Sequence, residues 1–180
     1  MAFLKIAATV FFAVAASAAN VITFQSLDST DRTVYVTPSA GVEGPQPVDV
    51  PGGASVDVTF VEGFLGNAYA VKKGAANTPG MLAEVNFNGW NGLTYFDVSA
   101  IVDPNDKDNV KEMYPADGSK TPVSGCSNFP CNNAYYQPDD IQTKSTDQTH
   151  LIVTLGQNNG AASKRAEHTD VGRNFVVEKY

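Results

Sequence analysis

The stretch that decides the fold runs from residue 82 to residue 100 and reads LAEVNFNGWNGLTYFDVSA. Residues 82–87 alternate between two faces, and residues 93–100 do the same. A period of two is typical of a β-strand with one buried face. The Asn-Gly pairs at 88–89 and 91–92 favour turns. The stretch therefore predicts two antiparallel strands joined by a short connection.

The same alternation recurs along the chain. In residues 55–60 the apolar side chains Val56, Val58 and Phe60 fall on one face, and the polar side chains Ser55, Asp57 and Thr59 fall on the other. Further strands are predicted at residues 21–24, 33–37, 66–72 and 150–155, with Gly, Pro, Asn and Asp clusters between them. Short strands at this spacing predict an all-β fold, an antiparallel β-sandwich with little helix. The expected inward-facing side chains are Val56, Val58, Phe60, Val85, Phe87, Phe96 and Val98.

Two regions between these strands give no such pattern. Residues 103–125 and 132–147 are polar and rich in turn formers, and we expect them to form long ordered loops over one end of the sandwich. The sequence has no convincing helix, and residues 105–114 allow one or two helical turns at most.

The two ends of the chain differ from the middle. Residues 1–19 combine Lys5, an apolar run at 6–16 and small residues up to Ala19, the pattern of a secretory signal peptide. We therefore expect residues 20–156 to be one secreted domain, extracellular or in a cell wall. Residues 157–180 predict a flexible tail with the dibasic pair Lys164-Arg165, which proteases either process or leave intact.

The charge limits the partners. The chain has 12 basic and 19 acidic side chains, and removal of residues 1–19 takes away Lys5 and no acid, which leaves a net charge of −8. Such a chain is repelled by nucleic acids and by anionic membrane surfaces. Neutral polymers or cationic groups are the expected partners, and we expect a monomer.

The chain has two cysteines, Cys126 and Cys131. In an oxidising secretory compartment we expect them to form a local disulfide. A free pair or a metal-binding pair is the alternative, but no further cysteine lies nearby.

The two strands of the opening stretch carry acids on their polar faces. Pairing Val85 with Phe96 places Glu84 directly opposite Asp97, with Cβ atoms about 4.5–5.5 Å apart. Two acids this close raise the pKa of one of them, or recruit a cation or ligand hydroxyl groups. The pair could bind sugar or hydrolyse a glycosidic bond, and the alternative is a solvated polar surface.

The order of these motifs resembles the thaumatin-like proteins, and in particular small fungal secreted proteins described as antigenic thaumatin-like or yeast-phase-specific. The resemblance rests on LAEV at 82–85, YFDVS at 95–99, IVD at 101–103, and CNNAYYQPDD at 131–140 followed by LIVTL at 151–155. It implies a β-sandwich with an acidic cleft for β-glucan, formed by Glu84, Asp97 and Asp103.

The chain also departs from that family. The arginine of the cleft falls within residues 66–72, where the sequence has no Arg and offers Lys72 or Lys73 instead. The fourth acid of the cleft is absent near residues 124–127, and one possible disulfide replaces many.

Other candidate sites are weaker. The acidic stretch 103–108 resembles the start of a calcium-binding loop, but it lacks the glycine that such a loop needs at its sixth position. We expect no metal and no cofactor. Trp90 and Tyr95, with Tyr135 and Tyr136, could stack on sugar rings.

Three functions follow from these observations. The first is a secreted fungal binding or interaction protein, acting at a cell wall or on a host protein as an effector or antigen, without catalysis. The second is a weak β-1,3-glucan hydrolase that uses Glu84 and Asp97. The third is a structural component of the cell wall.

Overall fold

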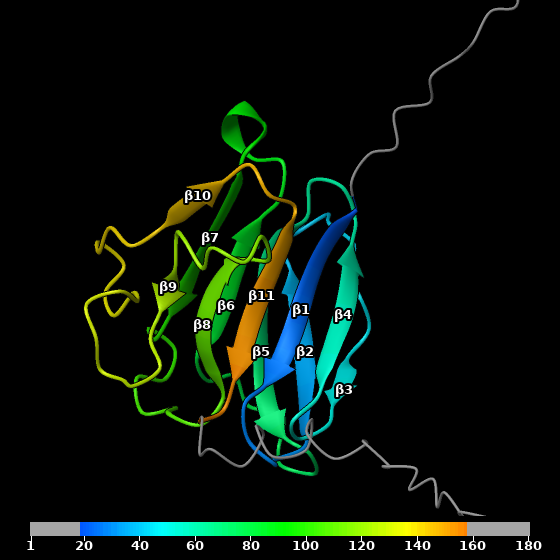
Figure 1. The fold of residues 1–180 in the computed structure, drawn as a ribbon, viewed down its shortest axis with the longest axis vertical. Coiled ribbons are helices and arrows are strands. Elements are labelled where there is room, and N and C mark those ends of the chain that lie inside the picture. The colour runs from blue at the N-terminus through cyan, green and yellow to red at the C-terminus, as the bar shows by residue number, and fades with distance from the viewer. Residues whose placement is uncertain (1–18, 158–180) are drawn as a thin grey trace, which may run out of the picture.

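The computed structural model describes residues 19–157, which form a sandwich of two β-sheets (Figure 1). One sheet has five strands in the order β4-β1-β11-β8-β9, and the other has six in the order β10-β7-β6-β5-β2-β3. The expected all-β sandwich is confirmed. The predicted signal peptide and most of the predicted C-terminal tail, with its dibasic pair, lie outside the described residues. The strands are β1 (Asn20–Ser26), β2 (Arg32–Pro38), β3 (Val48–Val50), β4 (Ser55–Phe60), β5 (Leu65–Lys72), β6 (Leu82–Asn86), β7 (Thr94–Ser99), β8 (Val110–Pro115), β9 (Ser124–Gly125), β10 (Lys144–Thr146) and β11 (His150–Leu155).

The first and last strands of the domain lie side by side. β1 pairs in parallel with β11, and Val21 faces His150 at one end of the ladder. The other paired strands run antiparallel, including β1 with β4 and β6 with β7. Strands from the two ends of the domain therefore pair within the five-stranded sheet.

The core lies between the two sheets. The seven side chains that the alternation predicts to face inward all belong to it, with Val56 half-buried at its margin. Three aromatic rings meet near one end: the centroids of Phe60 and Phe64 lie 4.7 Å apart and those of Phe60 and Phe87 lie 5.8 Å apart. Burial of large apolar side chains of this kind supplies the main driving force for the fold.

The helical turns that the sequence allows within residues 105–114 are absent, because β8 occupies Val110–Pro115. The predicted loops also contain β9 and β10. β8 lies between β11 and β9 and is buried along nearly its whole length, Lys111 included. A strand buried on both faces has no alternating pattern, which explains why the sequence did not reveal it.

Helix is confined to η1 (Trp90–Gly92), a single 3-10 turn, within the part of the chain that the structure describes. No helix there has the length and apolar character needed to cross a membrane.

A buried ion pair closes the end of the sandwich where β11 finishes. Arg32 is 1% exposed and donates hydrogen bonds of 2.8 Å to both carboxylate oxygens of Asp28. Its guanidinium also donates to the carbonyl of Asp108, at 2.7 Å. The backbone of Gln157 donates to Asp28 at 3.2 Å, and Gly156 beside it has φ +79°, with no room for a Cβ against that carboxylate. The pair joins the start of β2, the segment before β8 and the end of β11.

Candidate functional site

The two acids of the opening stretch meet across neighbouring strands. In the register of β6 and β7, Glu84 faces Asp97 and Val85 faces Phe96, as the alternation predicts. The connection bends back through Asn88, Asn91 and Gly92, with φ values of 51°, 59° and 71°. Asn and Gly adopt these left-handed conformations more readily than other residues. The local sequence therefore fixes the register that brings the acids together.

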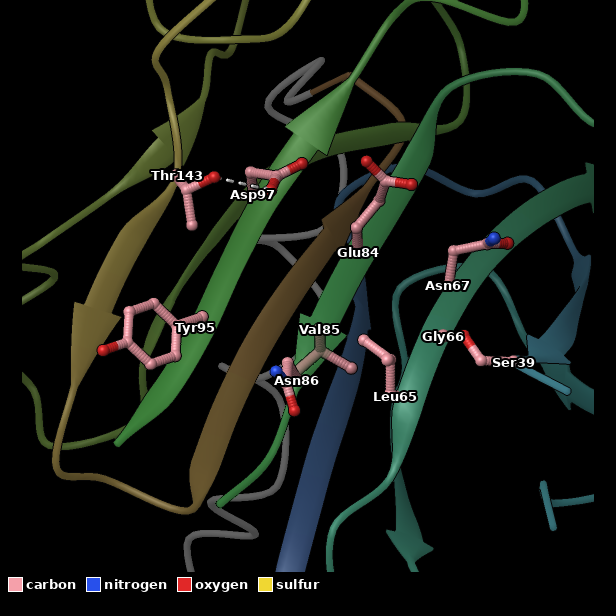
Figure 2. A pocket seen from close by; sticks show the side chains of 10 residues that line it. All are labelled: Ser39, Leu65, Gly66, Asn67, Glu84, Val85, Asn86, Tyr95, Asp97 and Thr143. Carbon is pink, nitrogen blue, oxygen red and sulfur yellow. Dashed lines mark hydrogen bonds between the residues drawn. The ribbon is translucent and has the colours of Figure 1, made fainter. Parts of the chain in front are cut away.

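The acids line a pocket on the outer face of the six-stranded sheet (Figure 2). Its volume is about 330 Å³. Strands β5, β6 and β7 form its floor, and residues before β10 and after β2 reach it from the two sides. The lining residues are Ser39, Leu65, Gly66, Asn67, Glu84, Val85, Asn86, Tyr95, Asp97 and Thr143.

Asp97 is the most buried polar residue of this pocket, since it is only 8% exposed. Its Oδ2 accepts a hydrogen bond of 3.3 Å from the hydroxyl of Thr143. Its Oδ1 is buried and has no hydrogen-bond partner among the described residues. Burial, and next the neighbouring Glu84 carboxylate, raise the pKa of Asp97 to about 7. Near neutral pH this carboxyl group is therefore partly protonated, whereas an exposed aspartate is ionised.

Two hydroxyl groups, those of Tyr135 and Thr143, form a hydrogen-bonded chain that ends at Asp97. The hydroxyl oxygens of Tyr135 and Thr143 lie 2.8 Å apart, and the backbone N–H of Thr143 donates to the Tyr135 oxygen at 3.3 Å. When Thr143 donates to Asp97, the Tyr135 hydroxyl must donate to Thr143. Tyr135 thus orients the group that holds Asp97.

None of the described basic side chains forms an ion pair with the acids of the pocket. The ion pairs in the described part of the chain are Asp28–Arg32, Asp49–Lys73 and Glu112–Lys120, and none involves Glu84 or Asp97. Lys73 lies 2.7 Å from Asp49, so it does not replace the arginine of a thaumatin-like cleft, and Lys72 does not line the pocket. Lys144 pairs with Phe96 in the sheet register, which places it on the inward-facing side of β10.

The other predicted binding residues lie in different places. Tyr95 lines the pocket, and its hydroxyl donates to the carbonyl oxygen of Trp90 at 3.2 Å. Trp90 is 81% exposed in the turn beside the pocket and is not one of the lining residues. Asp103 lies beyond the end of β7, also outside the lining, and accepts a hydrogen bond from the backbone of Asn105. Of the predicted binding residues, Glu84, Asp97 and Tyr95 therefore line the pocket, and Asp103 does not.

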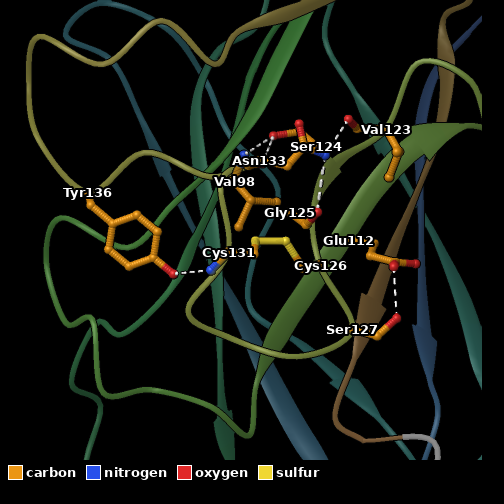
Figure 3. Close-up of a disulfide and its surroundings, with 10 residues drawn as sticks. All are labelled: Val98, Glu112, Val123, Ser124, Gly125, Cys126, Ser127, Cys131, Asn133 and Tyr136. Atoms are coloured by element: carbon orange, nitrogen blue, oxygen red, sulfur yellow. Dashed lines mark hydrogen bonds between the residues drawn. A yellow bond between two sulfur atoms is a disulfide. The ribbon is translucent and has the colours of Figure 1, made fainter.

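The predicted disulfide is confirmed, and it stabilises the region beside Asp97 (Figure 3). Cys126 and Cys131 have Cα atoms 6.6 Å apart. The loop between them follows β9, where the Ser124 hydroxyl accepts a hydrogen bond of 2.9 Å from the backbone of Val98. Asn133 donates to the carbonyl oxygens on both sides of Ser124, at 2.8 and 3.2 Å. The disulfide loop is thus linked to β7 at the residue after Asp97.

Sequence reasoning missed four polar lining residues. Asn67 and Asn86 share the outer face with Glu84 and could have been found from the alternation once the strand order was known. Ser39 and Thr143 stand outside the predicted strands, and no local pattern places them at the pocket. In the described residues no group of three or more His, Cys, Asp or Glu side chains is arranged to hold a metal ion.

Comparison with family models and with solved structures gives two findings. No family model matches the chain. The protein elicitor MoHrip2 from Magnaporthe oryzae, in its crystal structure, has a similar fold with a TM-score of 0.59, over 76% of this chain and 98% of that chain. The two sequences are 15% identical, so this likeness shows the fold alone. Neither finding names a thaumatin-like protein, and that resemblance stays a prediction.

A curated relative is much closer in sequence. Antigenic protein SchS21 from Stachybotrys chartarum is 52% identical over 135 residues, which cover 75% of this chain and 93% of that protein. Identity at this level over nearly the whole relative shows common descent and a common fold. The chain belongs to the family of the antigenic protein SchS21.

Proposed function

We propose that this chain is a secreted fungal binding protein, an effector or antigen that acts at a cell wall or on a host, and that it binds a polysaccharide in the pocket of Glu84 and Asp97. β-Glucan is the first ligand to test, followed by other cell-wall polysaccharides. The observation that carries the proposal is the buried Asp97 Oδ1, which lacks a partner among the described residues beside a pocket of about 330 Å³.

The chemistry of the lining supports a sugar. Amide groups of Asn67 and Asn86 and hydroxyl groups of Ser39, Tyr95 and Thr143 surround the acids. These groups both donate and accept hydrogen bonds, which suits the hydroxyl groups of a sugar. Trp90 is exposed, and its backbone carbonyl accepts the hydrogen bond of the lining residue Tyr95, so its indole is a candidate flat apolar face for a further sugar unit.

Binding is favoured over hydrolysis by the arrangement of the acids. Glycosidases hold two carboxyl groups about 5 Å or more apart, with the bond to be cleaved between them. Here Glu84 and Asp97 are direct cross-strand neighbours, and their carboxyl groups point toward each other (Figure 2). A glycosidic oxygen has no room between two carboxyl groups in contact. The raised pKa of Asp97, about 7, is the feature that keeps hydrolysis as a second candidate, because a general acid needs such a value.

The names of similar proteins support the biological setting. SchS21 is an antigenic protein of a fungus, and MoHrip2 is an elicitor of a fungus. An antigen or an elicitor must reach another organism, which agrees with a secreted chain. The disulfide agrees with an oxidising compartment.

A co-sedimentation assay with insoluble β-1,3-glucan and other cell-wall polysaccharides tests the proposal. We expect the wild-type protein to sediment with at least one of them and the double variant Glu84→Gln/Asp97→Asn to stay in solution. The matched control is Asp57→Asn/Asp117→Asn, which removes two exposed acids away from the pocket. Equal binding by both double variants would refute the assignment of the pocket. Release of reducing sugar by the wild type, but not by either single pocket variant, would establish the hydrolase.

A further inference from the structure

Within residues 19–157, no basic side chain forms an ion pair with the acids of the pocket. Glu84 and Asp97 lie opposite each other, and no ion pair of the described residues includes either of them. The groups that face Asp97 are Glu84 from β6 and the Thr143 hydroxyl from the segment before β10, while Asn67 faces Glu84 from β5. Lys144 acts on Asp97 only at a distance. Ionisation of both acids therefore leaves two adjacent negative charges without a cation.

The contact between the acids needs a hydrogen-bond donor. Asp97 Oδ2 accepts from Thr143, and the other oxygen is turned toward the carboxyl group of Glu84 (Figure 2). Two ionised carboxylates offer only acceptors at such a contact. A proton on one of the two carboxyl groups would supply this donor. Glu84 is partly exposed and Asp97 is buried, so Glu84 is the member that can move aside for a ligand.

From this geometry we propose that the pocket selects a sugar with a free, protonated amino group, a hexosamine unit of a deacetylated aminopolysaccharide. The inference rests on the polysaccharide-binding function proposed above and names its preferred unit. The ammonium group donates to Glu84 and to Asp97 in place of that proton. The amide groups of Asn67 and Asn86 and the hydroxyl group of Tyr95 form hydrogen bonds with the hydroxyl groups of the sugar ring.

Binding is then an exchange of one cation for another. Before binding, Glu84 and Asp97 together carry one proton and one negative charge. The ammonium group forms charge-assisted hydrogen bonds to both carboxylates, and the proton of Asp97 leaves to the solvent. Proton release is greatest below the pKa of Asp97, where the free pocket still holds the proton.

This exchange of a proton for an ammonium group explains why the pocket should bind an amino sugar more tightly than other ligands. A neutral sugar can donate hydroxyl groups to the pocket, but it cannot compensate the second negative charge. A bare metal ion would find only two carboxylates, and it would leave the amide and hydroxyl lining unused. An N-acetylated sugar has lost its positive charge and adds an acetyl group where the acids need a donor.

Isothermal titration calorimetry with three oligosaccharides of equal length tests the inference. The probes are a β-1,4-linked glucosamine oligomer, its N-acetylated form and a β-1,3-glucan oligomer, each titrated at pH 6 in two buffers of different ionisation enthalpy. We expect the glucosamine oligomer to bind at least about tenfold more tightly than the other two, the effect of one or two charged hydrogen bonds. We also expect it alone to release a proton. Asp97→Asn should abolish the proton release and weaken this binding about tenfold or more.

The control is Asp57→Asn, the same change of charge on the five-stranded sheet. Equal weakening by Asp57→Asn and Asp97→Asn would mean general attraction to an acidic protein and would overturn the inference. Equal affinity for the three oligomers, sensitive to Asp97→Asn, would overturn the inference but leave the proposed function standing. Absence of binding to any saccharide, in this titration and in the sedimentation assay, would remove both.

Discussion

Glu84 and Asp97 occupy directly opposed positions on β6 and β7, and the buried Oδ1 of Asp97 has no hydrogen-bond partner among the described residues. This relationship couples three properties of the protein: its stability, the protonation of its pocket and the ligand that it can accept.

The first prediction concerns the free energy of unfolding and its pH dependence. The pKa of Asp97 is raised from 3.8 to about 7 in the folded chain, so between these values the folded state binds more protons than the unfolded state. Stability therefore falls as the pH rises through this window. Asp97→Asn removes the penalty, and we expect a gain of about 1–3 kcal/mol at pH 8 and little change at pH 4. Urea unfolding at both pH values measures this difference. An equal effect at pH 4 and pH 8 would contradict the raised pKa of Asp97.

The second prediction concerns the hydroxyl chain behind Asp97. Tyr135→Phe removes the donor that orients the Thr143 hydroxyl toward Asp97. Because the bond from Thr143 stabilises the ionised form, its loss should raise the apparent pKa of Asp97 further. We also expect a loss of about 1 kcal/mol in ligand binding. A carboxyl carbon NMR titration reads the pKa. Tyr136→Phe is the control, because the Tyr136 hydroxyl accepts from the backbone of Cys131 and does not contact Thr143.

The third prediction concerns the disulfide. Replacement of Cys126 and Cys131 by Ser should lower the free energy of unfolding by about 2 kcal/mol, since the closed loop is short. The domain should still fold, because its core lies between the sheets and not in this loop. Hydrogen exchange at the Val98 amide should become faster, since that amide donates to Ser124 beside the loop. Reduction of the wild type should give the same result. Two reactive thiols in the secreted protein would refute the disulfide itself.

The fourth prediction concerns the buried ion pair. Burial favours the neutral form of Asp28, but hydrogen bonds from Arg32 and from the Thr30 backbone outweigh it and lower the pKa of Asp28 to about 2. The stability that this provides is complete above the ordinary value of 3.8 and is lost as the pH falls toward 2. After allowance for solvent screening it amounts to roughly 1–2 kcal/mol.

Asp28→Asn should cost more than this, about 3 kcal/mol near pH 7, because it leaves the Arg32 charge buried without a partner. The variant should also lose less stability than the wild type between pH 4 and pH 2. Thermal unfolding across this range is the measurement. Asp49→Asn is the control, since it breaks an exposed pair with Lys73 and should change the stability little. A similar loss in both variants would show that the buried pair has no special role.

The candidate site divides into a part that the sequence predicts and a part that it does not. Glu84, Asp97 and Tyr95 were found from the alternation of two neighbouring strands, because a hairpin brings residues close in sequence into register. Thr143 lies 46 residues from Asp97 in the sequence, and its contact depends on β10 joining the sheet beside β7. No local propensity encodes such a pairing.

The sequence by itself determined the sandwich class, the disulfide and the opposition of Glu84 and Asp97, because each of these follows from period-two patterning or from neighbours in the chain. Three features follow from the tertiary structure alone. β8 is an interior strand of its sheet, the described domain ends against the pair of Asp28 and Arg32, and Asp97 is buried with no ion-pair partner among the described residues. The physical reason is that burial and charge compensation arise from segments distant in sequence. A carboxyl group acquires a raised pKa only when the whole fold has removed its water and placed its neighbours.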